Sequence, residues 1–143
     1  METLGDLTAC RGFFVFGRFA VIAFFAIIFL QSSLDKLLDP EGNLEYLRDH
    51  FKSAPISPEM VVPLFWVLTA LELAAGAFSG LALVTFSFWS GGFIARWAVR
   101  FATLALLSLL VGQRLAKDYA GAAVVASYFA VALIGLVFFA IGR

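Results

Sequence analysis

Long runs of apolar residues, separated by short polar breaks, dominate the chain. They cover residues 13–33, 60–86, 93–113 and 119–141, and each is at least 21 residues long. About 20 helical residues cross a ~30 Å hydrocarbon core, whereas barrel strands are about 10 residues of alternating pattern, which these runs lack. We therefore predict an all-α integral membrane protein. Its single domain, residues 1–143, is expected to be a four-transmembrane-helix bundle with both termini on one side.

The only long connection, residues 34–59, has a different pattern and holds six of the ten acidic residues. Asp39-Pro40 is typical of an N-cap followed by proline in the first helical turn. Leu44, Leu47 and Phe51 then share one face, and Pro55 follows as a helix breaker. The pattern predicts a short amphipathic helix that lies on the membrane surface or caps the bundle.

Composition agrees with the membrane prediction, because 62% of the residues are hydrophobic, only 14% are charged, and the mean hydropathy is +0.97. A soluble domain of this size needs more polar surface. The net charge is zero, so nothing indicates a nucleic-acid partner. Cys10 is the only cysteine and His50 the only histidine, which excludes a thiol pair, a bis-histidine haem and a histidine-rich metal site within one chain. We therefore lean against an enzyme with its own metal, haem or thiol chemistry, and we expect His50 to be solvated.

The count of cations on the two sides does not decide the orientation of the chain in the membrane. The side of the termini has Arg11, Arg18, Arg96, Arg100 and Arg143, and the other side also has five. The N-terminus and the short link at Ser90-Gly91-Gly92 are basic and nearly free of acids, so we expect them, and both termini, to be cytoplasmic.

Charged residues inside the predicted spans are the candidate functional residues, since a charge near the bilayer centre costs roughly 2.5–3.5 kcal/mol. Antiparallel threading places Arg18 and Arg100 in one half of the membrane, within reach of Glu72 near the middle of the second span. We predict an ion-pair cluster of these three residues. It is either a structural clamp or, because its positive charge is in excess, a site for a quinone carbonyl, an anionic substrate or a lipid phosphate. Arg96 is expected to reach the headgroups, and Lys36 is a second candidate interface residue.

Small residues mark a candidate packing face. Gly76 and Gly80 form a GxxxG pair in the second span, which allows close approach of another helix. The pair either closes the bundle or joins it to a partner subunit.

Several short motifs together resemble the DoxX family of small bacterial membrane proteins over about residues 13–140. They are an arginine early in the first span, Leu34-Asp35-Lys36-Leu37 at its end, a proline-containing Ser-Ala-Pro-Ile, Leu71-Glu72-Leu73 with Gly76, and residues 117–122, Lys-Asp-Tyr-Ala-Gly-Ala. The resemblance implies a four-helix bacterial inner-membrane protein. Family members include a subunit of thiosulfate:quinone oxidoreductase, and Arg18, Lys36 and Glu72 match the family's recurrent polar positions.

Three functions follow as alternatives. The first is a DoxX-like protein that supports a quinone-linked membrane redox complex, with a bound quinone or anionic lipid and no covalent cofactor. The second is a non-catalytic accessory subunit of a larger respiratory or photosynthetic complex, whose partners are membrane lipids and other membrane subunits. The third is a small transporter, which four short spans without an inverted repeat disfavour.

Overall fold

The computed structural model describes residues 4–141, with side chains from Thr8 onward, and within that range the chain is helical without a strand. Arg143, counted above among the cations, lies outside the described residues. The elements, in chain order, are α1 (Leu4–Leu38), α2 (Pro40–His50), the 3-10 turn η1 (Pro58–Met60), α3 (Val61–Val84), α4 (Ser87–Ser90), α5 (Phe93–Leu115) and α6 (Tyr119–Ile141).

Four of these elements are long and apolar enough to cross a membrane: Thr8–Leu38, Pro58–Val84, Phe93–Leu115 and Tyr119–Ile141. The number and order of the long apolar helices are as predicted. The bounds of the first differ, because the predicted run ends at Ser33 and the helix continues to Leu38. Lys36 therefore lies on a helix and not in a loop.

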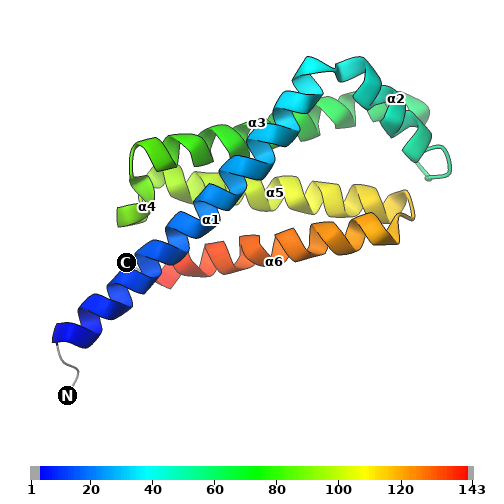
Figure 1. Cartoon of the computed structure of the whole chain (residues 1–143). Helices are drawn as coiled ribbons and strands as arrows, with labels where there is room; N and C mark the ends of the chain where they lie inside the picture. The colour runs from blue at the N-terminus through cyan, green and yellow to red at the C-terminus, as the bar shows by residue number, and fades with distance from the viewer. Residues whose placement is uncertain (1–3, 142–143) are drawn as a thin grey trace.

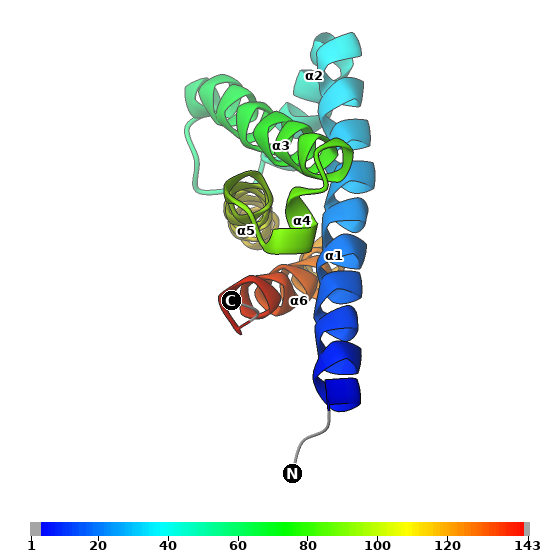
Figure 2. The ribbon, with the colours of Figure 1, turned by 90° about the vertical axis from the view of Figure 1, so that its left-hand side faces the viewer.

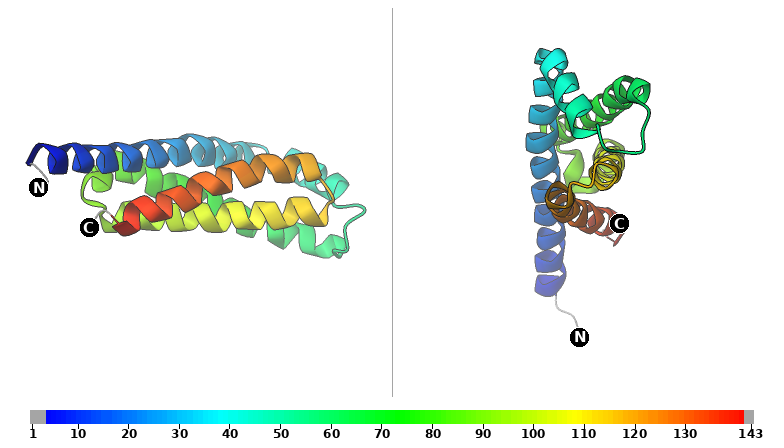
Figure 3. Two further views of the ribbon diagram at one scale, coloured as in Figure 1. Left: turned by 90° about the horizontal axis from the view of Figure 1, so that it is seen from below. Right: turned by 90° about the vertical axis from the view of Figure 1, so that its right-hand side faces the viewer.

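The four long helices pack in the order α1, α3, α5, α6, and α1 also contacts α5 and α6. Figure 1 and Figure 2 show α1 running obliquely across the other three. The first turns of α1 and the last turn of α6 lie at one end of the bundle, and α2 lies at the other (Figure 3). We call these the termini end and the cap end.

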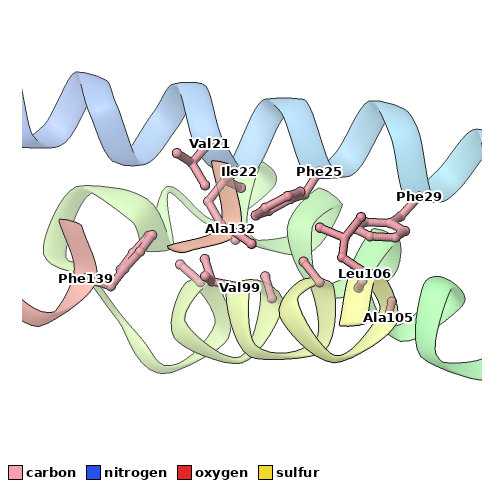
Figure 4. Packing of buried hydrophobic residues seen from close by; sticks show 14 of the residues in the cluster. Val21, Ile22, Phe25, Phe29, Val99, Ala105, Leu106, Ala132 and Phe139 are labelled. Atoms are coloured by element: carbon pink, nitrogen blue, oxygen red, sulfur yellow. The ribbon is translucent and has the colours of Figure 1, made fainter. Parts of the chain in front are cut away.

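Large side chains of α1 meet small side chains of α5 in the core. Phe25 and Phe29 are almost fully buried, and α5 turns a row of alanines toward the interior. The row, with helical spacing, is Ala95, Ala98, Ala102 and Ala105, all with no exposed surface. Figure 4 shows the α1 side chains directed toward α5 and toward Ala132 of α6. The small alanines leave room for the phenylalanine rings between α1 and α5.

The amphipathic helix α2 forms where it was predicted. A carboxylate oxygen of Asp39 accepts a hydrogen bond from the Gly42 backbone N–H at 3.0 Å, and proline occupies the first turn. Leu44, Leu47 and Phe51 are half-buried. The helix ends at His50, before Pro55.

The link between α3 and α5 is more elaborate than the predicted Ser-Gly-Gly turn. Phe86 and Gly91 both adopt left-handed backbone conformations, with φ of 53° and 65°, and the short helix α4 lies between them. Gly91 tolerates this conformation because it has no Cβ. The link therefore folds back against α1, which α4 contacts.

Candidate functional site

Glu72 is buried at the contact between α3 and α1. Its side chain is 1% exposed, and the Nζ of Lys36 donates to its Oε2 at 2.7 Å. The Oγ of Ser32 donates to the same oxygen at 3.2 Å and accepts from Lys36 at 2.8 Å. These three residues form what we call the Lys36–Glu72 clamp.

Local helical geometry builds the clamp. Ser32 and Lys36 are four residues apart on α1, so they share one face of that helix. That face is turned to α3 because Gly76, one turn after Glu72, lets the two backbones approach. A Cβ on Gly76 would lie 2.8 Å from the backbone nitrogen of Leu30. Removing one partner of such a buried ion pair typically costs about 3–5 kcal/mol, so the clamp ties α1 to α3.

The predicted cluster of Arg18, Glu72 and Arg100 does not assemble: within the described range, Glu72 makes its ion pair with Lys36. Arg18 and Lys36 are 18 residues apart on α1, which is about 27 Å at a rise of 1.5 Å per residue. A glutamate bound to Lys36 therefore lies too far from Arg18. The prediction failed because α1 is longer than its apolar run.

The arginines have other surroundings at the termini end. Arg18 is buried, its Nε donates to the backbone oxygen of Phe138 at 3.1 Å, and its guanidinium lies 5.3 Å from the Phe139 ring centroid. Arg100 is exposed and lies over the Trp97 ring at 5.0 Å. Arg96 is half-buried on the first turn of α5. Arg18 therefore joins α1 to α6, while Arg100 faces outward.

The glycine pair packs inside the bundle. Gly76 lies against the backbone of α1, whereas a Cβ on Gly80 would meet only the tip of the Leu30 side chain at 3.7 Å. In this chain the close approach joins α3 to α1, so Gly76 is engaged within the subunit.

A pocket of about 320 Å³ lies at the cap end, between α2, the start of α3 and the end of α5. Most of the residues that line it are apolar. The polar ones are Lys36, Asn43, Tyr46, His50, Ser108 and Gln113. An apolar cavity of roughly 300–1,000 Å³ with a few polar groups has the character of a small-molecule site. The pocket was not predictable from the sequence, because its walls come from four separate segments of the chain.

The last turn of α2 closes one side of the pocket. His50 Nε2 lies 3.0 Å from Oε1 of Gln113 and 4.0 Å from Oδ2 of Asp118, and Tyr46 stacks on the imidazole. The tip of the Phe51 ring is 3.5 Å from where a Cβ of Gly112 would lie. The expectation that His50 is solvated is wrong: it is half-buried and bonded to α5. Its four-residue spacing from Tyr46 was the available sequence signal.

Asp49 and Lys52 form an exposed ion pair at the C-terminal end of α2. The hydrogen bond and the charge of Lys52 hold the pKa of Asp49 below its ordinary value, and those of Asp49 raise the pKa of Lys52. Both side chains are exposed, so solvent screens the pair and it adds little to stability.

The described residues contain no group of three or more histidine, cysteine, aspartate or glutamate side chains placed to hold a metal ion. Cys10 is exposed at the termini end. The candidate site is therefore the pocket at the cap end together with the clamp beside it.

Comparison with family models, with curated proteins and with solved structures finds no match to this chain.

Proposed function

We propose that this chain is a multi-pass membrane protein that binds a lipid-soluble quinone in the pocket at the cap end and thereby supports a membrane redox complex. The observation that carries the proposal is a largely apolar pocket with Lys36 among its lining residues, set among four helices apolar enough to cross a bilayer. The redox role itself follows from the resemblance to the DoxX family. Other membrane subunits are the expected partners.

The pocket suits a ring with a lipid tail. Its lining includes Leu64, Val67 and Val111, which are 45%, 58% and 51% exposed on the outer faces of α3 and α5. A ligand held there has a lateral path to the surface, where an apolar tail would lie in the bilayer. A quinone ring would occupy the interior of the pocket.

Lys36 supplies the polar contact for the ring. An ammonium has three N–H donors, and the described contacts of Lys36 use two of them, toward Ser32 and Glu72. The third is able to donate to a quinone carbonyl. The chain has one cysteine and one histidine, so we assign electron transfer to a partner subunit and ligand binding to this one.

The proposed location is the bacterial inner membrane, with the termini end in the cytoplasm. That end has Arg11 in the first half of α1 and Arg96 and Arg100 in the first half of α5, whereas the acidic residues of segment 35–59 belong to the cap end. The cations are equal in number at the two ends, so the orientation is proposed from the scarcity of acids at the termini end. The pocket would then open near the outer surface of the membrane.

The test is quinone content after purification in mild detergent. Wild-type protein should carry extractable quinone, Lys36→Met should lose most of it, and Lys52→Met, which removes an exposed lysine outside the pocket, should retain it. The proposal would be contradicted if the wild-type protein carried no quinone and also did not bind added short-chain ubiquinone. Equal quinone content in both variants would remove Lys36 from the site.

An accessory subunit is the second candidate, favoured by a shallow apolar groove on the outer faces of α1 and α6. It is lined by Phe13, Phe14, Leu133, Ile134, Val137 and Phe138. A neighbouring membrane helix would fit such a surface. Stoichiometric co-purification with a larger complex that is lost in Ile134→Glu, with no quinone in the wild type, would favour this function over the first.

A further inference from the structure

We propose that Glu72 makes the pocket selective for uncharged ligands, so that it accepts a carbonyl or hydroxyl oxygen and rejects a carboxylate or phosphate. The inference rests on the proposed function, because it assigns the charge of the ligand that the pocket binds. It concerns a residue that does not line the pocket and acts through Lys36.

Lys36 sets the electrostatics of the cavity. Of the described residues on its wall, Lys36 is the one lysine, and no arginine, aspartate or glutamate is among them; His50 and Tyr46 are the other titratable side chains. An ammonium alone on an apolar wall would attract any anionic amphiphile strongly, because the field of a charge is weakly screened there. A bare lysine would therefore select fatty acids or acidic lipids.

Glu72 changes this outcome. Its Oε2 lies 2.7 Å from the ammonium, and its side chain is 1% exposed, so the pair is close to neutral as seen from the cavity. An anionic ligand that approached Lys36 would meet the repulsion of a buried carboxylate and would have to weaken an existing ion pair. A neutral oxygen accepts the remaining N–H and leaves the pair intact.

Ser32 stabilises this arrangement by donating to the same carboxylate oxygen and accepting from Lys36. The ammonium is therefore held by two acceptors on two helices and is not free to swing toward an anion. The clamp acts as a fixed, neutral hydrogen-bond donor group at the edge of the pocket.

A matched pair of ligands tests the inference: a fluorescent polyene fatty acid and its methyl ester, which differ only in the charged head. Binding is followed by energy transfer from tryptophan in detergent solution at pH 8.5. The wild type should bind the ester at least tenfold more tightly than the ionised acid. Partition of each ligand into protein-free micelles is measured and corrected for in the wild-type ratio, and it cancels when the ratio is compared between variants.

The decisive variant is Glu72→Gln, which keeps an oxygen acceptor of the same size and removes the charge. It should lower the ester-to-acid affinity ratio at least tenfold, mainly by improving the acid. The control is Glu59→Gln, which removes an exposed acid outside the pocket and should leave the ratio unchanged. An unchanged ratio in Glu72→Gln, or a wild type that prefers the acid, would overturn the inference.

A second measurement needs no substitution and so remains available if Glu72→Gln fails to fold. In the wild type, affinity for the acid should fall as pH rises through the acid's own pKa. The ester does not ionise, so the pH dependence of its affinity measures effects that come from the protein, including His50 and Tyr46. Parallel pH profiles for acid and ester would overturn the inference and leave the pocket intact. Binding of neither ligand, together with no response to a short-chain ubiquinone, would overturn the proposed function and the inference with it.

Discussion

Replacing Gly76 with alanine tests how closely α1 and α3 approach each other. A Cβ at this position would lie 2.8 Å from the backbone nitrogen of Leu30 and 3.0 Å from the carbonyl carbon of Phe29. These are backbone atoms of a packed helix, so no side-chain rotation relieves the clash. The matched control is Gly80→Ala, one turn further along, where the new methyl group would be 3.7 Å from the tip of the Leu30 side chain.

Two opposing effects determine the magnitude. Alanine is favoured over glycine inside a helix by about 0.5–1 kcal/mol, and this gain applies at both positions. Overpacking a close contact costs about 1–3 kcal/mol, and this cost applies only at Gly76. We therefore expect Gly76→Ala to lower the free energy of unfolding by up to about 2.5 kcal/mol and Gly80→Ala to raise it by up to about 1 kcal/mol.

The measurement is reversible unfolding of the purified protein in mixed detergent micelles, by titration with a denaturing detergent and tryptophan fluorescence. The difference between the two alanine variants isolates the cost of overpacking, since the helix-propensity gain is common to both. If Gly76→Ala were as stable as Gly80→Ala, α1 and α3 would not approach as closely at Gly76 as the structure shows. Gly76 would then not be what positions Lys36 beside Glu72.

The remaining predictions concern the two connections. Gly91→Ala should lower stability by about 1–2 kcal/mol, because its φ is +65° and its Cβ would lie 3.2 Å from the Arg18 guanidinium, and thermal unfolding in detergent would measure the loss. Phe86→Gly should raise the free energy of unfolding by about 1 kcal/mol in the same experiment, because Phe86 is exposed and its left-handed backbone is strained for a residue with a Cβ. A lower free energy of unfolding would show that the packing of the Phe86 ring outweighs this strain. His50→Ala removes a hydrogen bond worth about 0.5–1.5 kcal/mol, so limited proteolysis within residues 51–57 should accelerate about two- to tenfold, with Asp49→Ala as a control that leaves the rate unchanged.

The four long helices were predictable because the length of their apolar runs distinguishes them from strands and from shorter helices. A run of 21 or more apolar residues has few alternatives to a membrane-crossing helix, and α6 begins and ends where its run does. The cap of α2 was equally readable, since Asp39-Pro40 is a local signal that needs no tertiary information.

The rotation of each helix about its axis was not predictable. α3 is apolar on all faces, so its sequence does not indicate which neighbour Glu72 meets. The prediction paired Glu72 with arginines by estimated depth, and depth was measured from the start of an apolar run and not from the start of the helix. Polar residues that extend α1 to Leu38 placed Lys36 within reach instead. The pocket depends on the same information, since its walls meet only after the helices have taken their rotations.

The hydrogen bond from Arg18 to Phe138 joins residues 120 positions apart in the chain, whereas Lys36 and Glu72 are 36 apart. At a synthesis rate of about 5–20 residues per second, Glu72 follows Lys36 within roughly 2–7 s, and Phe138 follows Arg18 after roughly 6–24 s. The α1–α3 pair therefore has time to assemble while later helices are still being made. The bond between Arg18 and α6 closes only after α6 has been made. A chain truncated before α6 would therefore form the Lys36–Glu72 clamp and lack the bond that joins α1 to α6 at the termini end.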